Sequence, residues 1–298
     1  MNIIGHKSIF LSISGILFLA SIIAIAVFGF KPGIDFVGGT LWQLEFPSGD
    51  VSREQVEEFF KSNLKFTPVV VTTSEAGGAN FIVRTPEITE ADHATHLARI
   101  SKELKTVEEL QFQTIGAAIG HELRNKAITA FILVLVGISL YIAFAFRKVS
   151  RPVSSWKYGI ITLVTLFHDA LIPAGMRALL GQFLNLEIDT NFIVAILVVM
   201  GFSVHDTIVV FDRIRENLRV IGISKKTFAE LVNESVNQTM ARSINTSLTL
   251  VLVLIAMYIF GAVNLQYFIL VILVGTVVGT YSSIFVASPI LTMWQRRI

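Results

Sequence analysis

Residues 243–295 read SINTSLTLVLVLIAMYIFGAVNLQYFILVILVGTVVGTYSSIFVASPILTMWQ and contain no charged side chain. As one continuous helix, these 53 residues would be about 80 Å long, whereas the hydrocarbon core of a membrane is about 30 Å thick. The segment therefore predicts two membrane-spanning helices. The turn signal near its middle is Gly261-Ala262-Val263-Asn264.

The rest of the chain contains four more apolar runs of spanning length, which predicts an all-α bundle of six transmembrane helices. The expected spans are about residues 9–30, 127–146, 158–180, 190–211, 243–261 and 265–293. Residues 9–30 follow Lys7 and contain Ala24-Ile25-Ala26, so a cleaved signal peptide is an alternative. The run is longer than the apolar core of a typical signal peptide, which favours a retained helix.

Lysine and arginine in the short connections set the expected orientation, because cytoplasmic loops are enriched in both. With a cytoplasmic N-terminus, thirteen such residues fall on the cytoplasmic side, and the short outer loops hold only Arg177. The thirteen are Lys7, Arg147, Lys148, Arg151, Lys157, Arg213, Arg215, Arg219, Lys225, Lys226, Arg242, Arg296 and Arg297. The sequence thus predicts a multi-pass membrane protein with both termini cytoplasmic. Disulfides, thiolate metal sites and cysteine nucleophiles are excluded because the chain has no cysteine.

The chain divides into a first helix (residues 1–30), an extracytoplasmic segment (31–126) and a five-helix bundle (127–298). The outer segment has fourteen acidic and ten basic side chains and a different periodicity. Strands are expected at 41–46, 68–73, 81–84 and 110–115, with a turn at Gly77-Gly78. Helices are expected after Ser52 and Thr89. The order β-α-β-β-α-β predicts an α+β domain of the ferredoxin-like type.

Two local motifs are weak signals for a cofactor. Residues 33–40 (GIDFVGGT) have glycines suited to a tight turn but lack the pattern of a nucleotide-binding loop. A helix-to-strand connector with Asp35 as a local cap is the plainer interpretation. Residues 121–125 (HELRN) resemble half of a zinc-protease motif, but Asn125 stands where the second histidine is needed. No metal site and no catalytic residue are expected.

Polar groups inside the predicted spans are the strongest functional signal, because charges in hydrocarbon are costly and usually line a pathway. The third span carries His168 and Asp169 near its middle. The fourth carries Ser203, His205, Asp206 and Thr207, and the fifth opens with Arg242, Ser243, Asn245, Thr246 and Thr249.

Asp206 and Arg242 are expected near the same leaflet, which predicts an ion pair that protonation of Asp206 would break. The alternative is that Arg242 extends to the cytoplasmic surface and Asp206 caps a helix end. For His168 and Asp169, an interhelical hydrogen bond for packing and a proton pathway remain equally open. Asp169 and Asp206 are expected at different depths. Residues 212–217 (DRIREN) predict a solvated amphipathic helix on the inner membrane surface, or a docking site.

Residues 33–40, 168–169, 203–217 (SVHDTIVVFDRIREN) and 238–247 (QTMARSINTS) resemble the SecD/SecF family of bacterial protein-export membrane proteins, in the resistance-nodulation-division superfamily. The resemblance covers nearly the whole chain, and its short outer segment and the form Ile34-Asp35-Phe36 favour the SecF branch. By this resemblance, Gly33, Asp35, Gly38 and Gly39 form the family signature after the first helix. One departure is Ala117, where the family usually has proline.

The resemblance implies an accessory subunit of protein export, driven by the proton gradient, without cofactors and with protons as the coupling ion. Asp206 would be the proton carrier and Arg242 its counter-charge. The implied partners are SecD, the SecYEG channel with the SecA motor, YajC, the exported unfolded polypeptide and membrane lipid, and no nucleic acid. The competing functions are a small-molecule or lipid exporter of the same superfamily, an intramembrane enzyme, and a structural scaffold.

Overall fold

The computed structural model describes residues 1–48, 50–65, 68–75, 78–146, 153–184, 186–221, 226–262 and 265–295. It divides into two compact units. The helical unit comprises Met1–Phe30, Thr129–Leu186 and Asn191–Ile298, and the mixed unit comprises Lys31–Ile128 and Glu187–Thr190. A short segment far along the chain therefore belongs with the mixed unit.

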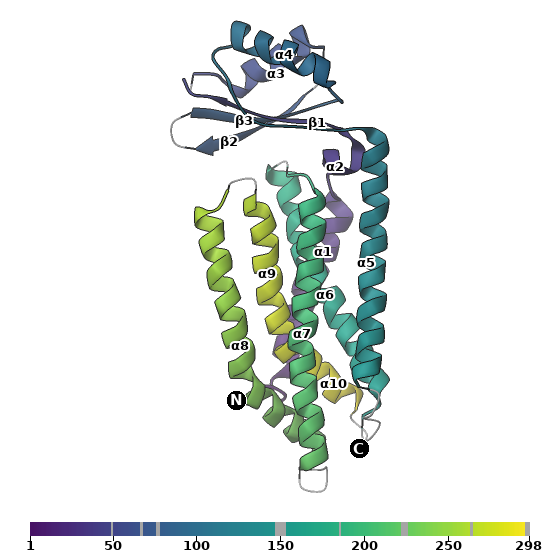
Figure 1. Ribbon diagram of the computed structural model, residues 1–298. Coiled ribbons are helices and arrows are strands. Elements are labelled where there is room, and N and C mark those ends of the chain that lie inside the picture. The colour runs from purple at the N-terminus through teal and green to yellow at the C-terminus, as the bar shows by residue number, and fades with distance from the viewer. Residues whose placement is uncertain are drawn as a thin grey trace. The chain divides into compact units, whose positions relative to one another are not determined.

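Within the described residues, six helices are long and apolar enough to cross a membrane, as the sequence predicts (Figure 1). They are α1 (Lys7–Phe28), α5 (Ala117–Ala145), α6 (Ser155–Leu184), α7 (Thr190–Val220), α8 (Phe228–Phe260) and a last helix in three consecutive parts. These parts are α9 (Gln266–Ser282), the π-helical turn η2 (Ser283–Ala287) and α10 (Ser288–Trp294).

Three helices extend well beyond their predicted apolar runs. α5 begins at Ala117, ten residues before the expected start at 127. α7 continues to Val220, and α8 begins at Phe228, fifteen residues before the expected start at 243. The early start has a local cause, because Thr227 and Glu230 form a complete capping box. Arg242 consequently lies inside α8. Of the predicted turn at 261–264, residues 263 and 264 lie outside the described residues.

The mixed unit contains a four-stranded antiparallel sheet of order β2-β3-β1-β4. Its elements are α2 (Ile34–Val37), β1 (Gly39–Phe46), α3 (Arg53–Asn63), β2 (Val69–Glu75), β3 (Gly78–Thr85), α4 (Glu90–Glu103) and β4 (Glu108–Ile115). Both α3 and α4 cover the same face of the sheet (Figure 1). Apart from α2, this is the predicted order of strands and helices. Gly77, half of the predicted turn, lies outside the described residues.

Alternation along β1 explains how this core forms. Trp42, Leu44 and Phe46 point to one face of the pleated strand and are fully buried. The apolar sides of α3 and α4 cover them, with Phe60 and Ile100 also fully buried. The core residues of the unit are Trp42, Leu44, Phe46, Val51, Val56, Phe59, Phe60, Leu64, Val70, Phe81, Val83, Ile88 and Ile100.

Candidate functional site

The buried carboxyl group of Asp169 is the centre of a polar cluster inside the helical unit. Asp169 lies on α6 and has no exposed surface. Pro173, one turn later on the same helix, has no N–H to donate to the Asp169 carbonyl, which weakens the helix at this point. An ionised carboxyl group at such a position is costly unless it is hydrogen-bonded or paired.

Side chains from α6, α7 and α9 bind Asp169, and α1 joins them through His168. His168 Nδ1 lies 2.8 Å from Asp169 Oδ1 and His168 Nε2 lies 2.5 Å from Ser14 Oγ on α1. In neutral imidazole one nitrogen donates and the other accepts, so Nδ1–H donates to the carboxylate and Nε2 accepts from the serine. Ser203 of α7 donates to Asp169 Oδ2, and Ser282 of α9 donates to the same oxygen over 2.5 Å. We call Ser14, His168, Asp169, Ser203 and Ser282 the Asp169 cluster.

Asp206 on α7 is contacted by Ser283, the residue of the last helix that follows Ser282. Ser283 Oγ donates to Asp206 Oδ2 over 3.0 Å, and its neighbour Ser282 donates to Asp169. Asp206 is itself only 4% exposed. The two carboxyl groups, expected at different depths, are thus both contacted by adjacent serines of one helical turn.

The serine pair lies where the last helix changes its winding. η2 begins at Ser283, directly after α9 ends at Ser282. A π-helical turn changes the direction in which successive side chains point, and such turns occur often at functional sites. Here the change of winding coincides with the two hydroxyl groups that contact different carboxylates. Ser282 and Ser283 are adjacent hydroxyl residues in an uncharged span, which is a weak sequence signal for such a role. Neither these two residues nor Ser14 was among the predicted site residues.

Arg242 does not join Asp206. Among the described residues the structure forms no ion pair between them, and the side chain of Arg242 is exposed on the surface of this chain. The reason is helical geometry: the next residue, Ser243, is 1% exposed and points into the bundle, and neighbouring residues of a helix point about 100° apart. The predicted Asp206–Arg242 ion pair is thus not present. His205 and Thr246 are exposed as well.

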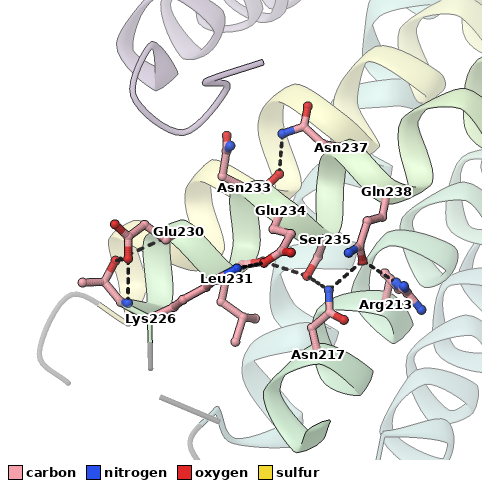
Figure 2. Close-up of polar contacts among 11 residues, drawn as sticks. Arg213, Asn217, Lys226, Glu230, Leu231, Asn233, Glu234, Ser235, Asn237 and Gln238 are labelled. Carbon is pink, nitrogen blue, oxygen red and sulfur yellow. Dashed lines mark hydrogen bonds and ion pairs between the residues drawn. The ribbon is translucent and has the colours of Figure 1, made fainter. Parts of the chain in front are cut away.

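A second polar cluster joins α7 to α8 (Figure 2). Asn217 is 6% exposed, and its Nδ2 donates to Ser235 Oγ over 2.8 Å and to Gln238 Oε1 over 2.9 Å. Arg213 Nε donates to the same Gln238 oxygen over 2.6 Å. Residues 212–217, predicted as an amphipathic helix, are an unbroken part of α7. Arg213 and Asn217 of this segment bind α8.

The N-terminal segment also binds α8. Asn233 Oδ1 accepts hydrogen bonds from the backbone N–H groups of Ile3 and Ile4, over 2.8 and 3.2 Å. Asn233 and Asn237 both donate to the Met1 carbonyl. A hollow of about 1140 Å³ lies beside these contacts and is lined by Met1, Asn2, Ile4, Gly5, Lys7, Lys226, Ala229, Glu230, Asn233, Glu234, Asn237 and Gln238. It contains none of the carboxylates of the Asp169 cluster or of Asp206.

The glycine-rich motif lies in the mixed unit, apart from these clusters. The connector interpretation expects Asp35 to cap its own short helix, α2, but its side chain does not do so. Its Oδ2 accepts hydrogen bonds from the backbone N–H and the hydroxyl of Thr190, the first residue of α7, over 2.7 and 2.6 Å. Gly38 and Gly39 have φ angles of 81° and 123°, in the region that favours glycine. His121 and Glu122 lie on the exposed side of α5, where Glu122 pairs with Lys126.

Comparisons with known proteins point to one family. The family model for the C-terminal part of the protein-export membrane proteins SecD/SecF matches residues 96–297, and the model for the SecD/SecF GG motif matches residues 23–46. The protein translocase subunit SecF of Thermobaculum terrenum is 41% identical over 100% of this chain and 95% of its own length. That of Anaerolinea thermophila is 35% identical over 99% and 94%.

One relative is longer than this chain and is named SecDF. The protein translocase subunit SecDF of Thermus thermophilus is 38% identical over 94% of this chain, which spans 37% of the relative. A crystal structure of SecDF from Thermus thermophilus, described as a translocon-associated membrane protein, superposes with a TM-score of 0.86 at 34% identity. It covers 100% of this chain, and this chain covers 39% of it. A super-membrane-facing form of SecDF superposes with a TM-score of 0.70.

Proposed function

The chain belongs to the SecD/SecF family of protein-export membrane proteins, and we propose that it acts as a proton-coupled subunit of a protein translocase. The observation that carries this proposal is the pair of buried carboxyl groups, Asp206 and Asp169, that accept hydrogen bonds from the adjacent residues Ser283 and Ser282. Titratable groups inside a membrane bundle are costly and mark pathways for ions or protons. Hydroxyl groups can both donate and accept, so they can relay a proton between carboxyl groups.

Asp206 and Asp169 are the proposed proton carriers, and His168 extends the connection to Ser14 on α1. Four helices meet here, so a change of charge at either carboxyl group would alter contacts between helices. One proton that crosses a potential of 100 mV releases about 2.3 kcal/mol, enough to shift a two-state equilibrium about fifty-fold. The coupling ion is the proton, and no cofactor is part of the proposal.

A partner is proposed to cover the exposed polar side of α8. Arg242, Thr246 and Thr249 are exposed at helical spacing on that helix. The SecDF relatives have more than twice the length of this chain, and their name includes a SecD part. We therefore propose SecD as the partner in a heterocomplex, with Arg242 acting as a counter-charge within that assembly. Family membership further suggests the SecYEG channel with SecA, YajC and the exported polypeptide.

The bacterial inner membrane is the proposed location, with both termini in the cytoplasm and the mixed unit outside. The strand order of the mixed unit and its two helices on one face support a ferredoxin-like domain. The names of the relatives, which are translocase subunits, favour this proposal over a small-molecule or lipid exporter.

Asp206→Asn tests the proposal. The variant is reconstituted with SecD, SecYEG and SecA in vesicles, and translocation is measured with and without a proton gradient. We expect that the gradient no longer stimulates translocation, while SecA-driven translocation continues. Asp212→Asn is the matched control, because Asp212 lies on the same helix but is exposed and pairs with Arg215. Normal stimulation of Asp206→Asn, at an unchanged amount of inserted protein, would refute the proposal.

A further inference from the structure

The loop between α6 and α7 is paired with the segment that leaves α1. Ile188 N donates to the Lys31 carbonyl and Gly33 N donates to the Ile188 carbonyl, each over 2.8 Å. These bonds make a parallel bridge between Pro32 and Ile188. A Cβ at Gly33 would lie 2.9 Å from the Ile188 oxygen, so this close approach requires glycine.

Asp35 binds the start of α7. The first N–H groups of a helix have no partner within the helix, and a carboxylate there is favoured by the helix dipole. Asp35 supplies this acceptor to Thr190 from a segment 155 residues away in sequence. The cap of α7 is thus provided by the motif that follows α1.

An ion pair fastens the same loop to the sheet. Arg84 Nε on β3 lies 2.8 Å from Glu187 Oε2, and the two side chains are only 16% and 17% exposed. Burial lowers the pKa of Arg84, while the charges of Glu187 and Asp189 oppose that change. Arginine stays charged in proteins, so loss of Glu187 would leave a largely buried cation without its nearest counter-charge.

The rest of the motif contacts the start of α5 and the sheet. A Cβ at Gly38 would lie 2.7 Å from Ala117 Cα, the first residue of α5. A Cβ at Gly39 would lie 2.8 Å from the Thr85 carbonyl of β3. Residues 33–39 therefore contact the α6–α7 loop, the start of α5 and the central strands within one compact unit.

We infer that Asp35 and the Arg84–Glu187 pair are positioning residues that hold the α6–α7 loop to the mixed unit throughout the working cycle, so that movements of α6 and α7 are passed to that unit. The inference rests on the proposed proton coupling. The loop continues directly into both helices that carry the buried carboxyl groups. Thr190 and Asp206 are 16 residues apart on α7, about 24 Å of continuous helix at 1.5 Å per residue.

We call the two side-chain attachments of the loop, Asp35 to Thr190 and Arg84 to Glu187, the clamp. The test removes both attachments and then replaces them with a disulfide bond. Asp35→Ala/Glu187→Gln removes both side-chain attachments, and Asp50→Ala removes an exposed pair with Lys105 of the same unit as the matched control. Pro32→Cys/Ile188→Cys places a disulfide bond at the Pro32–Ile188 bridge. The chain has no native cysteine, so these two cysteines can pair only with each other within the chain. Paired strands lie about 4.8 Å apart, within the Cα range of disulfides.

Two quantities are measured in vesicles with SecD, SecYEG and SecA: proton flux and gradient-stimulated translocation. We expect the open clamp to keep proton flux and to lose stimulation by about 5- to 150-fold, the usual range for coupling between two sites. Oxidation of the cysteine pair should restore stimulation to the open-clamp variant, and reduction should remove it again. A protein with merely damaged folding would lose both quantities and would not recover on oxidation.

Two results would overturn the inference. One is normal stimulation with the clamp open. The other is loss of stimulation when the cysteine pair is oxidised in an otherwise unchanged chain, because that loss would mean that the loop must detach during the working cycle. Asp206→Asn is run in parallel. Stimulation that survives in Asp206→Asn refutes the proposed function itself, whereas stimulation lost in Asp206→Asn but kept with the clamp open refutes only the clamp.

Discussion

Gly275→Ala should force α9 away from α7 and disturb the buried carboxylate contacts. A Cβ at Gly275 would lie 2.2 Å from Val199 Cγ2, 2.6 Å from Cγ1 and 3.0 Å from Cβ. Ordinary contact begins at 3.4 Å, so the nearest pair must separate by a further 1.2 Å. Rotation of the valine cannot relieve all three contacts, because both γ carbons and the β carbon are too close. Overpacking of this kind costs about 1–3 kcal/mol.

The same displacement reaches the polar connection two turns later. Ser283 Oγ lies 3.0 Å from Asp206 Oδ2, and a shift of more than about 0.6 Å would take this pair beyond hydrogen-bond distance. Gly279, one turn after Gly275, lies against Ser203, which donates to Asp169. We therefore expect Gly275→Ala to lower both thermal stability and gradient-stimulated translocation.

Thermal denaturation in detergent and the vesicle translocation assay measure these two effects. Val199→Ala removes both γ carbons, so the double variant should recover part of the loss, with a coupling energy of about 0.5–3 kcal/mol in a double-mutant cycle. Gly201→Ala is the control, because a Cβ there meets no atom within 4 Å. Gly275→Ala with unchanged stability and activity, or with no recovery in the double variant, would contradict this account of the α7–α9 contact.

Three further predictions concern the mixed unit. Trp42→Ala removes a fully buried ring whose Nε1 donates to Glu109 over 2.7 Å. It should lower the free energy of unfolding of the unit by about 3–5 kcal/mol, measured as the urea dependence of proteolysis within this unit. Unchanged resistance to proteolysis would count against the assigned core. Ser52→Ala removes the side-chain acceptor for the Gln55 N–H in the capping box and should cost about 1 kcal/mol in the same assay. Burial lowers the pKa of His96 below its ordinary 6.5, so the unfolded chain binds the proton first and the stability of the unit should fall as the pH drops through about 6.5. His96→Gln should weaken this pH dependence of stability between about pH 7.5 and 5. An identical slope in both proteins would exclude His96 as its source.

The sequence predicts the six spans and the order of strands because both follow from local patterns. Apolar runs of spanning length need no knowledge of their neighbours, and alternation in residues such as Trp42 and Leu44 shows which face of β1 is buried. Helix ends were harder to place. The polar residues at the start of α8 resemble a connecting segment, and only the capping box at Thr227 marks the true beginning.

The site could be predicted only in part, because its contacts are long-range. Asp169, Asp206 and His168 were conspicuous as polar residues in apolar runs. Ser14 and Ser282 were not, since serine is common in membrane helices and no local pattern shows which hydroxyl reaches a carboxylate. The direction of Arg242 depends on how α8 is rotated about its axis, which the packing of Ser243 and the other buried residues of that helix decides.

The π-helical turn at the end of the last helix holds one residue more than an ordinary α-helical turn. If all five residues of Ser283–Ala287 were wound as an α-helix instead, every later side chain would turn by about 100° around the axis. Trp294, whose ring now lies 5.2 Å from that of Trp156, would then face another direction. In homologous chains that keep the serine pair, we therefore expect this short segment either to keep its length or to lack one residue together with the π-helical turn, even where neighbouring loops vary freely in length.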